Sequence, residues 1–173
     1  MRSTLNARSA VLADEPKGTL FLLKRYRHQP IFGIKLSELV DQPVGKPRVL
    51  LLNSEFGRAG EADWHRIFLW EAEEWCVSFG TDWIVQPDFA ATSLSEINDP
   101  QQDACLTIGH NGIYFRAAPG DGFHASYRNF IHVDTLEMAK DLGNASFHLT
   151  GYRIFLNQGD WDKGRPPIYQ RGV

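Results

Sequence analysis

Short apolar runs separated by turn-forming residues recur along the chain and predict a series of strands. Each run is of strand length, and glycine, proline, asparagine or aspartate lies near its ends. The predicted strands cover residues 18–26, 46–53, 123–133 and 145–157. Asn111 and Gly112 join two further apolar runs, and because both residues tolerate positive φ they predict a tight hairpin.

A helical spacing of apolar residues replaces this pattern in a few places. Residues 61–73 keep that spacing and contain several glutamates and alanines, so we expect a helix there. The pattern then changes to alternation, and residues 75–79 and 83–86 flank a turn sequence that predicts a hairpin. Residues 134–143 begin with capping-box chemistry and end at a glycine, which predicts a second helix. Residues 34–43 are expected to form a short third helix.

These elements together predict the fold class. About eight strands and two or three helices, with hairpins dominating, indicate an α+β fold around a mainly antiparallel sheet. The chain has 173 residues, which is enough for one core of ordinary size. We expect one domain over residues 18–157. A loose arm or weak helix over residues 1–17 would precede it, and a turn-rich, polyproline-like tail over residues 158–173 would follow it.

Charge is distributed unevenly along the chain. The net charge is −3, but residues 67–112 contain 8 Asp and Glu and no Lys or Arg. Aromatic residues accompany the carboxylates in this block, a mixture that is typical of protein-recognition surfaces. The predicted partner-binding residues are Trp70, Glu71, Glu73, Glu74, Trp83 and Phe89. In the alternative, the mildly basic flanking segments fold back on the block and neutralise it.

The favoured function is therefore that of a non-enzymatic binding or regulatory protein. Its partner would be another protein of basic character, and inhibition of that partner would suit such a surface. No cofactor is expected, because the chain contains neither a GxGxxG nor a GxxxxGK[ST] sequence.

Two cysteines and the hydropathy of the chain limit its environment. Cys76 and Cys105 are not part of a CxxC pair, and both lie in apolar contexts, so we expect reduced, buried thiols. No apolar run approaches the roughly 20 residues that span a bilayer, and the N-terminus lacks the apolar core of a signal peptide. We expect a soluble, cytoplasmic protein without membrane contact.

One predicted strand carries residues that could do chemistry. His124, Ser126 and Arg128 alternate along it and would share one face, with neighbours roughly 7 Å apart. An enzyme acting on a phosphate-containing substrate, such as a nucleotide or RNA, could use Arg128 to bind phosphate and His124 as acid or base. His132 would lie roughly 26 Å from His124 and could not join it. The simpler interpretation is a solvated strand face.

Aromatic–arginine pairs suggest a second alternative. If the rings face inward, the arginines share an outer basic face that could bind phosphates or nucleic acid. The residues of this predicted face are Arg25, Arg27, Arg116, Arg128 and Arg153. The acidic balance of the chain argues against nucleic acid. An aromatic core beneath a charged outer face explains the same pattern.

Metal binding is not expected. His65 and Glu61 have the spacing of a helical pair, but no third ligand accompanies them. Asp160 and Asp162 match only part of a calcium-binding loop, since the distal glutamate is missing.

Overall fold

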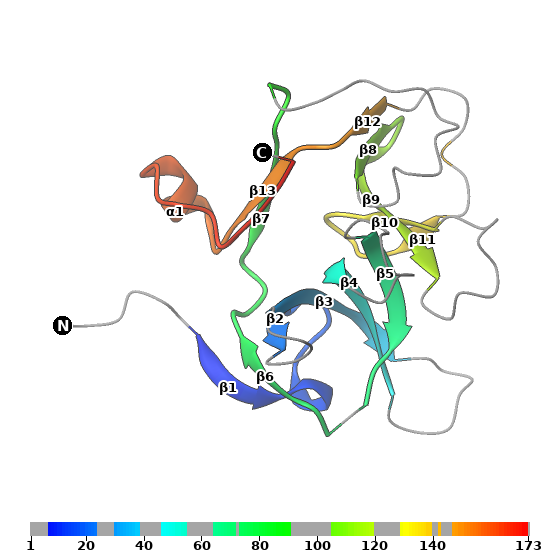
Figure 1. The fold of residues 1–173 in the computed structure, drawn as a ribbon, viewed down its shortest axis with the longest axis vertical. Coiled ribbons are helices and arrows are strands. Elements are labelled where there is room, and N and C mark those ends of the chain that lie inside the picture. Colours follow the sequence, from blue (N-terminus) through cyan, green and yellow to red (C-terminus); the bar gives the residue numbers. More distant parts are fainter. Residues whose placement is uncertain are drawn as a thin grey trace.

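The structure is a computed structural model that describes residues 7–23, 30–38, 46–54, 64–71, 73–90, 105–119, 129–139, 142 and 147–172. These residues form fourteen strands, one 3-10 helix and one short α-helix (Figure 1). The predicted α+β class is therefore wrong, because the described chain is mostly β and its only α-helix is α1 (Gln158–Asp162).

The strands form one large and one small sheet. The large sheet has eleven strands, and all of its pairs are antiparallel except β5 with β9. Along the sheet the order is β1 (Arg8–Val11), β6 (Trp75–Ser78), β2 (Leu20–Leu23), β3 (Ile31–Glu38), β4 (Pro47–Ser54), β5 (Trp64–Leu69), β9 (Gly112–Pro119), β10 (Asn129–His132) and β11 (Met138–Ala139). Two strands lie off this path: β8 (Leu106–Gly109) pairs with β9 and with β12 (Phe147–Leu149). The small sheet is ordered β14 (Tyr169–Arg171), β13 (Tyr152–Phe155), β7 (Ile84–Pro87). The mainly antiparallel pairing agrees with the prediction.

Several predicted strands are confirmed. The apolar runs at residues 18–26 and 46–53 contain β2 and β4. The hairpin near Asn111 is formed by β8 and β9, in which Gly109 faces Gly112 across the pair. Gly112 has a φ of 143°, a conformation that favours glycine.

The predicted helix over residues 61–73 is wrong, because Trp64–Leu69 is strand β5. Ile67 packs against one hydrophobic core and Phe68 against the other. A strand between two cores is apolar on both faces, and such a run can imitate helical spacing.

The other two predicted helices are also wrong. Residues 34–38 continue β3, because Ile34 and Leu36 are buried on one face. In the segment 134–143, a turn follows β10 and leads into β11. His132 supplies the capping contact there, since its Nδ1 accepts from the Asp134 N–H at 3.1 Å, and Leu136 has a φ of 56°, which is incompatible with a helix.

Two further predictions fail on pairing. β6 and β7 do not form a hairpin: β6 lies between β1 and β2, whereas β7 pairs with β13 in the small sheet. The predicted strand over residues 145–157 is split at Thr150 and Gly151 into β12 and β13, which belong to different sheets. Residues 8–14, assigned to an N-terminal arm, form β1 and a 3-10 helix (Leu12–Asp14), and Leu12 is fully buried.

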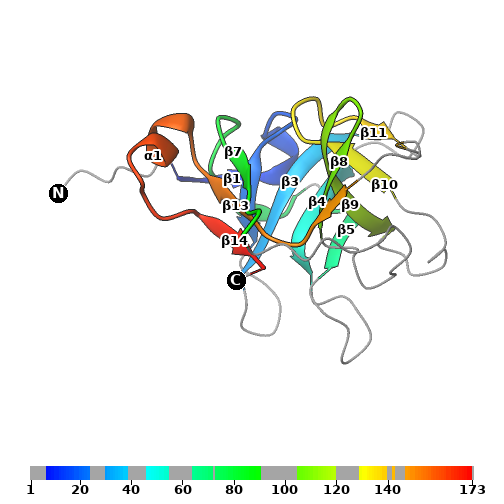
Figure 2. The same cartoon turned by 90° about the horizontal axis from the view of Figure 1, so that it is seen from above.

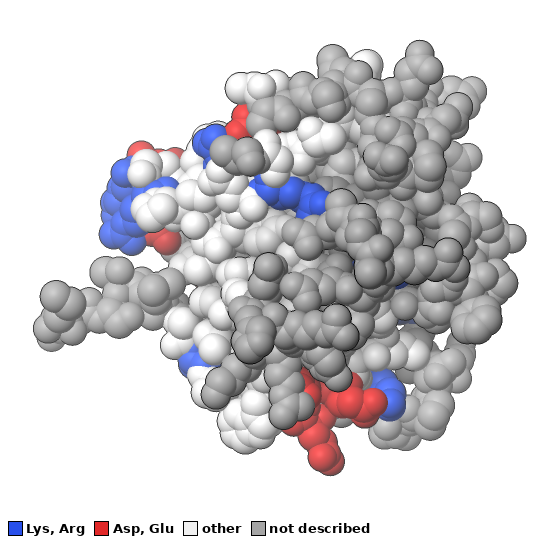
Figure 3. Space-filling view, viewed as in Figure 1, with Lys and Arg blue, Asp and Glu red and all other residues white. Residues whose placement is uncertain are grey.

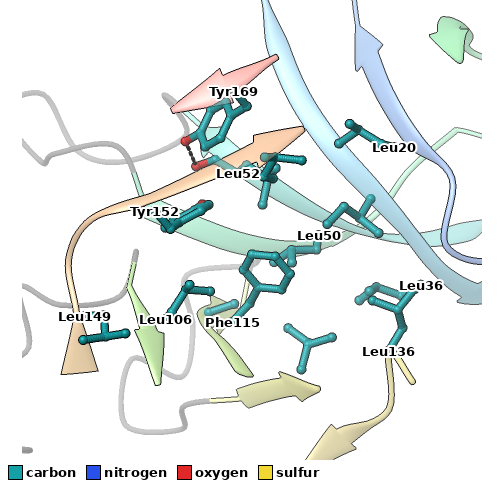
Figure 4. Close-up of a cluster of buried hydrophobic side chains, with 14 residues drawn as sticks. Leu20, Leu36, Leu50, Leu52, Leu106, Phe115, Leu136, Leu149, Tyr152 and Tyr169 are labelled. Atoms are coloured by element: carbon teal, nitrogen blue, oxygen red, sulfur yellow. Dashed lines mark hydrogen bonds between the residues drawn. The ribbon is translucent and has the colours of Figure 1, made fainter. Parts of the chain in front are cut away.

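Two hydrophobic cores lie on opposite faces of the large sheet. Core 1 fills the space between the large and small sheets (Figure 4), and the Tyr169 hydroxyl closes it by donating to the Leu52 carbonyl at 2.9 Å. Core 1 contains Leu20, Ile34, Leu36, Leu50, Leu52, Leu106, Phe115, Ala117, Ile131, Leu136, Leu149, Tyr152, Ile154 and Tyr169. Core 2 contains Ala10, Leu12, Phe21, Leu23, Ile31, Val49, Leu51 and Cys76.

Candidate functional site

An acidic turn connects β5 to β6. Glu71 and Glu73 are exposed and Glu74 is half-buried, and acidic side chains gather at this end of the molecule in Figure 3. Two backbone bonds hold the turn: the Glu74 N–H donates to Glu71 O at 3.3 Å, and the Leu12 N–H donates to Glu74 O at 2.9 Å. Lys46 Nζ forms an ion pair with Glu71 at 2.6 Å, so the basic flank reaches one of the three carboxylates.

Strand β6 carries exposed apolar side chains directly after this turn. Trp75 is 64% exposed and Val77 is 37% exposed. Cys76 and Ser78, which alternate with them along the strand, are buried. Val77 faces Leu22 across the sheet. Cross-strand partners share a face, so this apolar row continues the face that is covered by core 1. We call Glu71, Glu73, Glu74, Trp75 and Val77 the β6 surface.

The opposite face of β6 is fixed by a buried polar network. Glu15 is 3% exposed and accepts at 2.5 Å from both Ser78 Oγ and Arg8 Nη2. Lys35, 4% exposed, donates through Nζ to the Glu15 carbonyl at 2.6 Å. Burial, with the Glu15 carboxylate as a further cause, raises the pKa of Cys76 to about 11, so this thiol is a packing group and not a nucleophile.

The structure brings together four of the six predicted partner-binding residues. Trp70 is half-buried at the base of the acidic turn, where its ring meets Phe68 edge-on at 6.2 Å. The remaining two aromatic residues lie apart from the turn: Trp83 lines a groove beside β7, and Phe89 is 68% exposed beyond the end of β7. Sequence reasoning missed Trp75 and Val77 as surface residues, although their alternation with Cys76 and Ser78 was the signal for a shared face.

A groove of about 800 Å³ runs beside β7. It is lined by Trp83 and the whole of β7, by the turn after β10, by the start of β9 and by the turn before β2. Trp83 is held in place because its Nε1–H donates to the Gly18 carbonyl at 2.6 Å. Leu136 lines the groove from a buried position with left-handed backbone, and Trp161 of α1 adds a second indole. We call this cavity the β7 groove.

The predicted catalytic and phosphate-binding residues are distributed differently. His124, Ser126 and Arg128 lie outside the described residues, as do Arg25 and Arg27. Arg116 is 6% exposed, so its guanidinium does not lie on an open sheet face. Arg153 forms an ion pair with Asp88 at 2.6 Å.

A buried histidine links β5, β9 and β13. His65 lies 3.1 Å through Nδ1 from the Arg116 carbonyl and 2.5 Å through Nε2 from the Tyr152 hydroxyl. Because a carbonyl can only accept, Nδ1 carries the proton and Nε2 accepts from Tyr152. Burial, with the Arg171 charge as a second cause, lowers the pKa of His65 well below its ordinary value. Burial also raises the pKa of Tyr152 well above its ordinary value, so this hydroxyl keeps its proton. The pair is therefore neutral and cross-links the core.

A second buried histidine lies nearby. His148, 2% exposed, has Nδ1 at 2.8 Å from Thr107 Oγ1 and 3.9 Å from Cys105 Sγ. Its pKa is lowered by burial and by the Arg116 charge, which keeps the ring neutral. Within the described part of the chain, no group of three or more His, Cys, Asp or Glu side chains could hold a metal ion.

Comparison with known proteins adds no relative. No family model, no curated protein and no solved structure matches this chain. No helix in the described ranges is long and apolar enough to cross a membrane.

Proposed function

We propose that the protein is a non-enzymatic binding protein that presents the β6 surface to a basic partner protein. The observation that carries the proposal is Trp75, a residue that is 64% exposed beside an acidic turn on strand β6. Inhibition of the partner is one consequence that such binding would have.

The apolar part of the surface supports partner binding first. Trp75 and Val77 project from the uncovered end of an apolar sheet face, next to the half-buried Val11 and Leu22. Contiguous exposed apolar surface with a polar rim is typical of protein interfaces, and tryptophan is the residue type most enriched among interface hot spots.

The charge of the rim selects the partner. Among the described residues, Lys46 pairs with Glu71, and the Glu73 and Glu74 carboxylates have no ion-pair partner. Two carboxylates of this kind attract a basic surface and speed its encounter. An acidic partner would instead meet like charges.

The rigidity of β6 supports the same role. The bond from Ser78 to Glu15 and the pairing of β6 with both β1 and β2 hold the strand in place, so little backbone freedom remains to be lost on binding. A strand that is already ordered loses little conformational entropy when a partner binds, so less of the binding free energy is spent on ordering it.

Affinity capture with variants of the full chain tests the proposal. Wild-type protein, Glu73→Lys/Glu74→Lys and Trp75→Ser would be immobilised, and captured proteins identified and then titrated individually at low and high salt. A partner bound through the β6 surface should lose at least roughly tenfold in affinity with either variant, and its salt dependence should weaken with the charge reversal.

Two matched controls make the result specific. Glu137→Lys/Asp162→Lys changes the net charge equally at exposed positions away from the acidic turn, and Phe89→Ser removes an aromatic side chain that is as exposed as Trp75. Both controls should bind within about twofold of wild type. If every captured protein binds all variants equally, the β6 surface is not the binding site.

A further inference from the structure

We propose that the β7 groove binds an extended peptide segment that has apolar residues at alternate positions and adds as a strand to β7. This site is separate from the β6 surface and does not depend on it. The peptide would come from a partner protein and would pair through backbone hydrogen bonds, as in other cases of strand addition.

The groove lies along the edge of the small sheet and not over its face. All four residues of β7 line it, and no residue of the neighbouring β13 does. In a strand, successive side chains point to opposite faces, so a cavity over one face would touch alternate residues only. β7 is one of the two edge strands of the small sheet, which can be followed in Figure 2.

The pairing register shows which backbone groups face the groove. The Asp88 N–H donates to Gly151 O at 2.8 Å, and Gln86 faces Arg153 two residues further along the pair. Antiparallel pairs alternate between bonded and non-bonded positions, so the N–H and C=O of Val85 point away from β13. Within the described part of the chain these two groups have no hydrogen-bond partner.

A peptide backbone can form hydrogen bonds with both groups through its own C=O and N–H. Pro87 offers a further carbonyl on the same edge but no N–H, which limits how far pairing can extend. The four residues of β7 span roughly 13 Å, enough for a short strand of similar length.

The side chains of the groove favour apolar ligand residues. Trp83 and Trp161 supply two indoles, and Ile113, Val133 and Leu136 add aliphatic surface. One lysine, Lys17, and one aspartate, Asp134, line the groove, so the local charges balance and select neither an acidic nor a basic ligand. The volume of about 800 Å³ lies in the range of roughly 300–1,000 Å³ found for ligand sites.

A backbone substitution in the full chain tests strand addition. Val85→Pro removes the groove-facing N–H but leaves every hydrogen bond to β13 in place. Val85→Ala is the matched control, because it shortens the side chain further than proline does and keeps the N–H. The probes are end-blocked octapeptides with Val, Ile or Phe at alternate positions and Ser, Thr or Lys between them. Binding would be followed by tryptophan fluorescence. We expect at least one probe to bind wild type and Val85→Ala within about threefold of each other, and Val85→Pro at least roughly tenfold more weakly.

A second measurement uses wild-type protein and covers the case in which Val85→Pro does not fold. The binding probe is N-methylated at alternate peptide bonds, in two versions that block opposite edges of the strand. One version should lose at least roughly tenfold in affinity and the other should bind normally, since only one edge of the peptide faces β7.

Three outcomes would overturn the proposal. The first is that no octapeptide binds better than its scrambled version, and the second is that both N-methylated versions bind equally. The third is that the protein dimerises with the Val85 amide protected from hydrogen exchange, which would identify a second copy as the occupant. Glu73→Lys/Glu74→Lys should leave peptide binding unchanged, so failure here is distinguishable from failure at the β6 surface.

Discussion

The two ends of one sheet face have the same apolar pattern but different surroundings. At β3 and β4, Ile34 and Leu50 are fully buried, because the small sheet covers them to form core 1. At β6, Trp75 and Val77 continue the same face and remain exposed. Alternation along a strand therefore decides which side chains share a face, and only the packing of a second layer decides whether that face stabilises the fold or remains available to a partner.

The largest expected effect breaks the covered end. Leu50→Ala should lower the free energy of unfolding by about 2–5 kcal/mol, because it leaves a cavity in a closed core. The same change at the half-buried Leu22, between the covered and uncovered ends, should cost about half as much, and Val77→Ala less than about 1 kcal/mol. Urea denaturation of the three variants measures this gradient. Equal losses at Leu50 and Val77 would show that β6 is covered after all.

A smaller effect is expected from acid, again at the covered end. Burial depresses the pKa of His65 in the folded state, so the unfolded chain takes up a proton first as the pH falls below about 6.5. Stability that is fully present above that pH should then be lost as the pH falls towards the folded-state pKa. The loss is at most about 1.4 kcal/mol per pH unit for one histidine, and His148, whose pKa is depressed in the same direction, adds to it.

Urea denaturation at a series of pH values measures this loss for wild type and for two variants. His65→Gln should be less stable at neutral pH but should show a flatter pH dependence. His110→Gln makes the same substitution at an exposed histidine of the β8–β9 hairpin loop and should leave the stability at neutral pH within about 0.5 kcal/mol of wild type. A wild-type stability that does not change between neutral and mildly acidic pH would contradict the buried, neutral state of His65.

The sequence predicts a strand best where a short, continuous apolar run is bounded by turn residues. β2, β4 and the β8–β9 hairpin follow from apolar runs and turn residues, which act locally. The sequence predicts a helix at β5 because His65 and Arg66 interrupt its apolar run and leave the apolar residues at helical spacing. Both polar residues are buried, which is a property of the tertiary structure.

The candidate site could be predicted in part for the same reason. The acidic turn is local and was found from the charge pattern, whereas the exposure of Trp75 depends on where the small sheet ends. The β7 groove does not follow from the sequence, which predicts that β6 and β7 pair with each other, whereas among the described residues β7 pairs with β13 alone.

The smallest expected effect concerns the uncovered end itself. Trp75→Ser should change the free energy of unfolding by less than about 0.5 kcal/mol, because the side chain is largely in water.

The thiol of Cys76 reports whether this substitution disturbs β6. Cys76 lies on the opposite face of the same strand and is buried in core 2. Its pKa is about 11, so roughly one thiol in a thousand is ionised at about pH 8. Alkylation of Cys76 by iodoacetamide should therefore be slow and equally slow in wild type and Trp75→Ser. Faster labelling in the variant would mean that Trp75 holds β6 in place. A contribution to stability, and not partner recognition, would then explain the tryptophan at this position.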